Sequence, residues 1–360
     1  MAAHTEEQRA ELTRALDEFG QEYDASGAWP EKSIERMAAA GGWRWNIPAR
    51  YGGDPLAHGD LLRAYAALAA GCVSTALIST QRDGAVELIA TSGNEALKER
   101  LLPPLARGAF YTTVGIAQLT TSMRGGGQLM RAEPEGDGYR LNGMMPWATG
   151  AERAAWIVTG AVLADGNQIL AAVPTDREGL SVDKPEPLFT LNASRTSSVH
   201  CTDFRVEPDE MLRGPAEKVL ALRTPVKPLV TSACGMGVAD ALAAFIAQLR
   251  PGIRTHFIDV IEPLTARYEA VRAQLYGAAA QTDDPAYEAP STDIRIAVNE
   301  LLMRLALAAL TLSKGSGFLL SRPIQRHVRE ALFFLVWSAP AAVQLETLVR
   351  LMDALEVPRA

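Results

Sequence analysis

The hydrophobic pattern of this chain changes twice along its length, and these two changes constrain the fold more than any single motif does. Up to about residue 110, apolar residues such as Leu12 and Leu16 recur at helical spacing. Short runs rich in β-branched and aromatic residues follow, separated by turn signals such as EGDG and ADGN. Helical spacing then returns in four segments, 217–249, 253–279, 292–316 and 322–356. The sequence therefore predicts an α+β fold that is mainly α, with an N-terminal helical domain, a central antiparallel β-domain and a C-terminal helical bundle, at residues 1–110, 111–215 and 216–360.

Composition and charge narrow the class of protein. With 360 residues, 48% of them hydrophobic and 21% charged, the chain can bury a large core, as globular proteins do. Its net charge of −7 argues against a nucleic-acid partner, because nucleic-acid binders usually present a basic face. The first residues lack the basic start and apolar stretch of a signal peptide, and no apolar run reaches the roughly 18 residues of a membrane span. We therefore expect a cytoplasmic protein without a membrane span.

The sequence contains no motif typical of a metal site, a catalytic nucleophile or a phosphate-binding loop. Cys72, Cys201 and Cys234 are far apart and odd in number, which argues against a disulfide framework or a four-ligand zinc site. The five histidines have no metal-binding spacing, so no metal is expected. Neither a nucleophile elbow nor a phosphate-binding glycine loop occurs. The order of longer segments is more informative.

Four segments, in the right order and at the right spacing, resemble the acyl-CoA dehydrogenase family. They are AAAGGWRWNIPARYGGDP, GDGYRLNGMMPWATGAERAAWIVTGA, SRTSSVHCTDFRVEPDEML and KGSGFLLSRPIQRHVREA, at 38–55, 136–161, 194–212 and 314–331. The resemblance covers nearly the whole chain and agrees with the helix–sheet–helix order. It implies a flavin cofactor, FAD with FMN as the alternative, and a small-molecule or acyl-CoA substrate. It also implies a homodimer or homotetramer, or a hetero-oligomer with a homologue.

Trp147 and Thr149 are the candidate residues for one side of the flavin. They lie two apart, and on a strand two such residues share a face, one able to stack and the other able to donate a hydrogen bond. The resemblance implies that Trp147 packs on the isoalloxazine ring and that Thr149 reaches its N5. The competing interpretation is that Trp147 is a core residue of the sheet and Thr149 a turn residue.

The segment YTTVGIAQLTTSMRGGG (111–127) is the candidate for the other flavin wall, and it departs from the family. Ala117 stands where the resemblance implies a threonine beside the flavin pyrimidine, followed by Gln118. The family's small glycine turn is replaced by a Thr-Thr-Ser run with Met123 after it. Backbone N–H groups of this loop can still hold the flavin edge. Since the family also uses the loop near the thioester, the departure bears on CoA binding.

The resemblance implies a further set of contacts to the FAD diphosphate and adenosine. Arg254 and Phe257 match an R-x-x-F spacing, and Gly315 and Gly317 match the glycine stretch before the last helix. Arg254 can pair with a phosphate through a forked, charge-assisted contact. The alternative is a solvated arginine at a helix start. Pro263 lies in the segment that follows, where the family's own pattern is not recognisable.

The largest departure concerns the base of the reaction. An acyl-CoA dehydrogenase removes a proton with a carboxylate while a hydride goes to the flavin. The segment REALFFLVWSAP (329–340) aligns without gaps to the family's region, and the position of the usual glutamate is Ser338. Relatives that carry the base on an earlier helix align there with Lys227. Neither position holds a carboxylate, and Leu332 to Val336 are predicted to pack inside a last helix.

There are three candidates to substitute for the missing carboxylate: Glu330, the neighbours Arg82 and Asp83, and Ser338. Glu330 is predicted to be the structural partner of a nearby basic group. Arg82 and Asp83 fall where the family's N-terminal helices pass over the substrate pocket. Asp83 is either a base or, as we favour, the structural partner of Arg82. Ser338 can hydrogen-bond a flavin hydroperoxide or a substrate oxygen.

Three functions are compatible with these departures. The first is an FAD-dependent oxidoreductase that dehydrogenates an acyl thioester or a related substrate without the usual glutamate. The second is a flavin-dependent monooxygenase of the same fold, which the absent base and the altered loop favour. The third is a non-catalytic subunit that pairs with a catalytic homologue. Fold analogy alone does not separate them.

Overall fold

The N-terminal part of the chain is helical, as expected. A computed structural model describes residues 5–119, 130–220, 224–252, 255–284 and 286–352. Thr5 begins the first helix with a capping box formed with Gln8, and Asn94 caps the fifth through the Leu97 N–H. The helices of this part are α1 (Glu6–Ser26), α2 (Glu31–Ala39), α3 (His58–Gly71), α4 (Val73–Ala90) and α5 (Glu95–Ala106).

A single sheet follows the helices. Its strands are β1 (Tyr111–Gly115), β2 (Met130–Glu135), β3 (Gly138–Ala148), β4 (Ala154–Val162), β5 (Gln168–Pro174), β6 (Leu180–Val182), β7 (Ser197–Val206) and β8 (Met211–Ala216). The order is β6-β7-β3-β2-β4-β5-β8, and β1 pairs with β4. Most pairs are antiparallel, but β1 and β2 each pair with β4 in parallel. The sheet is therefore mixed. The β2–β3 hairpin lies between β1 and β4 along the chain, so that β4 runs beside β1 in the same direction.

The C-terminal part is a helical bundle whose last segment differs from the prediction. Its helices are α6 (Val230–Leu249), α7 (Thr255–Ala279), α8 (Ser291–Ser313), α9 (Pro323–Phe333) and α10 (Ala341–Leu351). The expected single helix over 322–356 is wrong, because a turn separates α9 from α10. In that turn Ser338 has a φ of 47°, and Pro340 precedes the first residue of α10. Neither fits a continuous helix.

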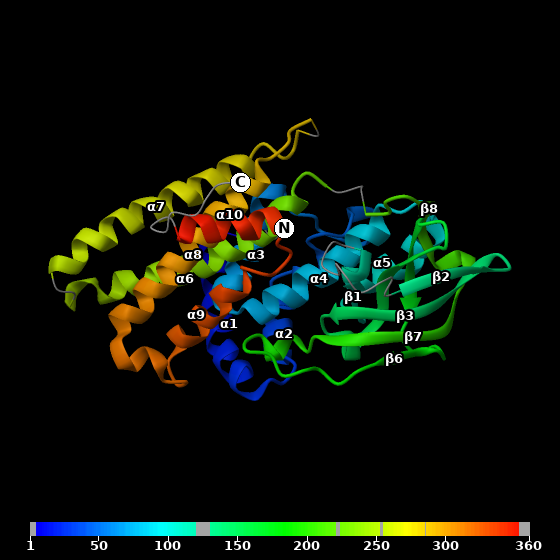
Figure 1. The fold of residues 1–360 in the computed structure, drawn as a ribbon, viewed down its shortest axis with the longest axis horizontal. Helices are drawn as coiled ribbons and strands as arrows, with labels where there is room; N and C mark the ends of the chain where they lie inside the picture. Colours follow the sequence, from blue (N-terminus) through cyan, green and yellow to red (C-terminus); the bar gives the residue numbers. More distant parts are fainter. Residues whose placement is uncertain (1–4, 120–129, 221–223, 253–254, 285, 353–360) are drawn as a thin grey trace.

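Helix α4 connects the parts of the molecule. It lies between the bundle and the sheet (Figure 1), and most of its residues are buried. Val73 belongs to the large core shared by the N-terminal helices and the bundle, whereas Ile78 belongs to the core of the sheet. Val86 belongs to a third core, made with α5, β1, β4 and β5. Most of α4 is buried because it packs against these three cores.

Two segments combine the length and hydropathy of a membrane-crossing helix. Lys227–Gly252 has a mean hydropathy of 1.7 and Ser291–Phe318 of 1.5. In the folded chain, 67% and 56% of these apolar windows are buried inside the structure. They form α6 and α8, whose residues Cys234, Val298 and Leu302 are fully buried in the large core. Burial in a bundle core accounts for their hydropathy.

Candidate functional site

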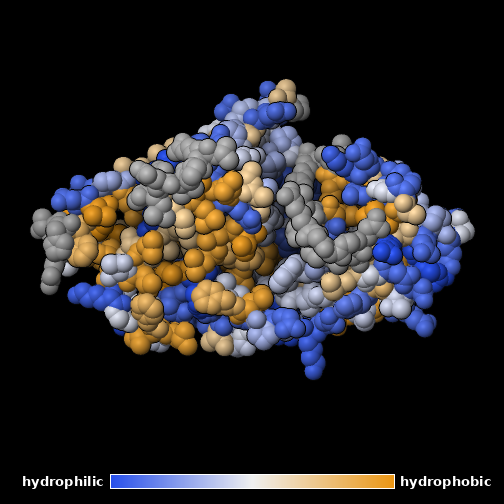
Figure 2. Space-filling model, viewed as in Figure 1, coloured by the Kyte–Doolittle hydropathy of each residue, from blue (hydrophilic) through white to orange (hydrophobic). Residues whose placement is uncertain are grey.

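The candidate site residues lie on both sides of the junction between the sheet and the helices. The surface of the molecule is hollowed between its helical half and its sheet half (Figure 2). Trp147 lies at the end of β3, Gln118 lies just after β1, and Ser338 lies after α9. Met123 and Arg254 lie outside the described residues, so their predicted roles stay predictions.

Trp147 has the properties of a residue that meets a ligand. The residue is 65% exposed, which is unusual for the largest aromatic side chain, and its φ is 59°. β3 and β7 are irregularly paired between Met145 and Ala148, so the strand ends in a bulge. Such backbone outliers are frequent at ligand sites. The interpretation of Trp147 as a core residue of the sheet is wrong.

The expected shared face of Trp147 and Thr149 is also wrong. Thr149 is 3% exposed, while Trp147 is open to solvent. The strand ends at Ala148, and the positive φ of Trp147 breaks the alternation of faces before Thr149. The Thr149 hydroxyl lies 3.2 Å from that of Thr196, and the Thr149 carbonyl accepts a hydrogen bond of 3.3 Å from the Tyr111 hydroxyl. Thr149 therefore fixes the base of this turn.

Gln118 is held firmly at the end of β1. Its Nε2 donates to the carbonyls of Gly115 and Gly160, each at 2.8 Å, and approaches the Thr159 hydroxyl at 3.0 Å. Its Oε1 is buried and has no hydrogen-bond partner among the described residues. A buried acceptor without a donor costs free energy. Together with the exposed Trp147 indole, it fits a flavin, whose ring supplies an aromatic face and an N–H edge. Ala117 lies beside Gln118 on the same 3-10 turn, η3 (Ala117–Leu119).

The predicted adenosine contacts lie on the bundle. Phe257, on the first turn of α7, packs against the large core. Gly315 and Gly317 lie on the 3-10 turn η10 (Lys314–Phe318). A Cβ at Gly317 would lie 2.8 Å from that of Ser313, so this position requires glycine, whereas one at Gly315 would meet no atom within 4 Å. Gly315 therefore leaves backbone open to a ligand.

Ser338 lies in an exposed turn that a buried arginine supports. Arg295 of α8 donates through Nη2 to the carbonyls of Phe334 and Trp337, both at 2.8 Å. Burial lowers the pKa of Arg295 to about 10. The prediction that Leu332 to Val336 pack inside a last helix is correct only in part. Phe334 is fully buried but lies just after the end of α9, while Leu332 and Val336 are 41% and 63% exposed.

Arg82 and Asp83 form a buried structural pair, as we favoured. Arg82 Nη1 donates to Asp83 Oδ1 at 2.6 Å, and its Nη2 donates to the carbonyls of Trp43 and Leu105. Asp83 Oδ2 accepts from the Tyr65 hydroxyl at 2.7 Å. Burial, followed by the charge of Asp83, holds the pKa of Tyr65 well above its usual value. Both oxygens of Asp83 are engaged, which leaves it poorly suited to accept a proton.

Glu330 is also a structural partner of basic groups. Arg326 Nη1 donates to Glu330 Oε1 at 3.0 Å, and the Val73 N–H donates to the same oxygen at 3.2 Å. Burial raises the pKa of Glu330, but Arg326 and His327 outweigh it, so the pKa lies below its ordinary value. Asp17 of α1 accepts from Arg326 and lies 3.1 Å from His327 Nε2. This cluster ties α9 to the N-terminal domain.

Lys227 meets a carboxylate that sequence reasoning missed. Its Nζ lies 3.3 Å from Glu87 Oε2, and the side chains are 32% and 19% exposed. Glu87 Oε1 accepts hydrogen bonds from the Thr224 hydroxyl at 2.8 Å and the Thr224 N–H at 3.3 Å. Glu87 is the last charged residue of α4, one turn after Asp83. A further charge on a largely buried helix was the available signal.

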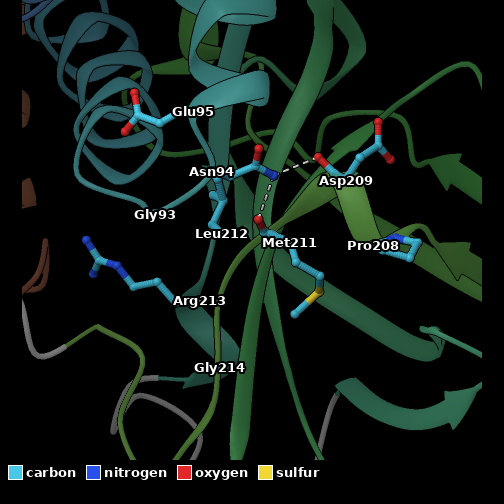
Figure 3. A pocket seen from close by; sticks show the side chains of 9 residues that line it. All are labelled: Gly93, Asn94, Glu95, Pro208, Asp209, Met211, Leu212, Arg213 and Gly214. Carbon is cyan, nitrogen blue, oxygen red and sulfur yellow. Dashed lines mark hydrogen bonds between the residues drawn. The ribbon is translucent and has the colours of Figure 1, made fainter.

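A separate surface pocket of about 590 Å³ lies where α5 begins against the approach to β8 (Figure 3). Asn94 donates through Nδ2 to the carbonyls of Asp209 and Met211, and Arg213 points along its other side. The pocket is open, and its lining contains none of the predicted site residues. We therefore do not place the flavin there.

Comparison with known proteins shows similarity to the acyl-CoA dehydrogenases. The family model described as "Acyl-CoA dehydrogenase, N-terminal domain" matches residues 3–109. The chain is 25% identical over 360 residues to the probable acyl-CoA dehydrogenase FadE25 of Mycobacterium tuberculosis, covering 93% of this chain and 91% of that one. This chain is a relative of the acyl-CoA dehydrogenases. The relationship spans all three predicted parts of the chain.

Solved structures show the same fold. The glutaryl-coenzyme A dehydrogenase glutaryl-CoA complex superposes with a TM-score of 0.84 at 20% identity, covering 98% of this chain and 94% of that one. The FAD complex of PigA gives a TM-score of 0.84 at 17% identity, with 96% of each chain covered. The fold predicted for this relative of the acyl-CoA dehydrogenases is therefore confirmed, although likeness at this identity concerns the fold alone.

Proposed function

We propose that the protein is an FAD-dependent oxidoreductase that dehydrogenates an acyl thioester or a related carbonyl compound. The observation that carries this proposal is the pair of features at the junction: the exposed, backbone-strained Trp147 and the buried acceptor of Gln118. They occur in a chain related to acyl-CoA dehydrogenases along nearly its whole length. FAD is the cofactor of the similar PigA complex.

The chain's own residues would bind and orient the flavin. Trp147 would pack on the ring, and Gln118 Oε1 would accept a hydrogen bond from the ring edge, while its Nε2 stays bonded to the Gly115 and Gly160 carbonyls. Arg254, Phe257, Gly315 and Gly317 remain the candidates for the diphosphate and adenosine. The bound flavin supplies the hydride acceptor. Arg295 holds the turn that carries Ser338, so a substrate oxygen there meets a hydroxyl rather than a carboxylate.

The decisive experiment mixes purified protein anaerobically with a series of acyl-CoAs and follows the oxidised flavin band. Bleaching by at least one thioester is the expected result. A protein that binds FAD but bleaches with none of them contradicts the dehydrogenase proposal. A chain without flavin and without activity by itself supports a non-catalytic subunit.

A flavin-dependent monooxygenase is the second candidate, because Ser338 places an exposed hydroxyl at the position of the usual base. A hydroxyl has no useful basicity at neutral pH but can donate a hydrogen bond to an oxygen atom. This alternative predicts that added reduced flavin and O2 are consumed together with a small-molecule substrate. The measurement is oxygen uptake with and without that substrate.

We also propose that the protein forms a homodimer or homotetramer through its C-terminal helices. Figure 2 shows apolar residues gathered over the helical half of the molecule. Large apolar residues that are exposed on the C-terminal helical part include Leu307, Phe318, Leu319, Leu320, Leu345 and Leu348. Patches of this kind mark protein–protein contacts. Light scattering of the purified protein tests the assembly, and the cytoplasmic location stays a prediction.

A further inference from the structure

The carboxylates near the domain junction differ in how far their oxygens are already engaged. Asp83 and Glu330 are each 2% exposed, and each is held by an arginine and by a further donor. The Glu87 side chain is 19% exposed. A proton acceptor must be reachable by the substrate and must keep a lone pair free for it. By this criterion Glu87 is the best placed of the three.

Glu87 is fixed through one oxygen and loosely paired through the other. The Thr224 hydroxyl and N–H both donate to Oε1. Among the described residues, the contact of Oε2 is with the Lys227 ammonium, at 3.3 Å. That separation exceeds the 2.7–2.9 Å or so of a tight charge-assisted hydrogen bond. The carboxylate is therefore oriented, while Oε2 can accept a new partner.

Gly84 lies close to Lys227 and to strand β1. A Cβ at Gly84, one turn before Glu87 on α4, would lie 3.4 Å from Lys227 Nζ and 3.6 Å from Val114 Cγ1. Helix α4, strand β1 and the lysine that precedes α6 thus converge at Gly84, one turn before Glu87. Val114 lies on β1, and Gln118, the residue that we assign to the flavin edge, lies on the 3-10 turn just after this strand.

We propose that Glu87 is the catalytic carboxylate that accepts the substrate's α-proton, with Lys227 as its positioning residue. The inference rests on the proposed dehydrogenase function. The α-carbon C–H bond breaks and its proton goes to Glu87 Oε2, while the electron pair forms the new C=C bond. The hydride from the β-carbon goes to oxidised flavin, so two electrons and two hydrogens leave the substrate. Lys227, 3.3 Å from Oε2, holds the carboxylate in place before the reaction.

The experiment compares wild type with Glu87→Gln, Glu87→Asp and Lys227→Met, and with Glu99→Gln as a matched control on exposed α5 surface. The first readout is the rate of flavin bleaching by butyryl-CoA and by any better thioester found in the series. The second readout is independent of flavin reduction: exchange of the thioester α-proton in D2O, followed by NMR. Flavin content and melting temperature show that each variant is folded.

The expected result is a loss of about 100-fold or more in both rates for Glu87→Gln, the usual scale for removing a general base. Partial activity should return in Glu87→Asp, and Glu99→Gln should match wild type. Lys227→Met should slow both rates less than Glu87→Gln does. A wild type that bleaches while Glu87→Gln does so equally fast overturns this inference alone. A wild type that neither bleaches nor exchanges overturns it together with the proposed function.

Discussion

Two ion pairs include carboxylates of α4 that lie one turn apart, Asp83 and Glu87. The pair formed by Asp83 is deeply buried, whereas the pair formed by Glu87 is not. Arg82 and Asp83 are 1% and 2% exposed, whereas the side chains of Glu87 and Lys227 are 19% and 32% exposed. A buried pair is tolerated only when its donors and acceptors are matched within the fold. A partly exposed pair with a long ion-pair contact can exchange that contact for one with a ligand. The degree of burial, rather than the pattern of charges, distinguishes the structural pair from the candidate functional pair.

Breaking the buried pair should have the largest effect on stability. Arg82→Met leaves Asp83 buried beside Tyr65 alone and removes the donor to the carbonyls of Trp43 and Leu105. We expect a loss of about 3–5 kcal/mol in the free energy of unfolding. Urea unfolding measures it. An unchanged midpoint would contradict the structural role of this pair.

Trp147→Ala tests the exposed side of the junction. Because Trp147 is 65% exposed, its removal should leave the free energy of unfolding of the flavin-free protein nearly unchanged. The dissociation constant for FAD should rise about tenfold, which corresponds to about 1.4 kcal/mol. Fluorescence titration of flavin measures the affinity. Equal affinity in the variant would refute our placement of the ring.

Asp240 extends the comparison to a carboxylate that, among the described residues, has no cationic side chain in close contact with it. Burial raises its pKa from 3.8 to about 6, although the Tyr268 hydroxyl bonds it at 2.8 Å. The folded state therefore holds its proton more tightly than the unfolded state, so stability should fall as pH rises from about 4 to 6. Asp240→Asn should remove this dependence and gain on the order of 1 kcal/mol at pH 7, less than the full linkage value because the side chain is 31% exposed. Unfolding midpoints at pH 4, 5, 6 and 7 measure it.

The smallest effect should come from an exposed pair. Arg100 Nη1 and Asp209 Oδ2 lie 3.0 Å apart, with side chains 44% and 62% exposed. Arg100→Met should change the free energy of unfolding by less than about 1 kcal/mol. It is also the matched control for Arg82→Met, because both remove an arginine from an ion pair. If Arg100→Met lowered the free energy of unfolding as much as Arg82→Met, burial would not determine how much these ion pairs contribute to stability.

The site shows where sequence reasoning stops. The structural roles of Asp83 and Glu330 could be predicted, because each lies close in sequence to the arginine that it pairs with. Glu87 could not be found in this way, since its partners Thr224 and Lys227 lie more than 130 positions away. The exposure of Trp147 depends on a positive φ in a strand bulge, which the two-residue alternation of a strand does not reveal.

The sequence by itself determined the order of helices, sheet and bundle, because hydrophobic periodicity is a local property of each segment. It also indicated the resemblance to acyl-CoA dehydrogenases, because four segments keep their order and spacing. Only the tertiary structure decided that β1 and β2 pair in parallel with β4, that the last predicted helix breaks at Ser338, and which charges are buried. Burial depends on how α4 is enclosed by three hydrophobic cores, and those contacts join residues distant along the chain.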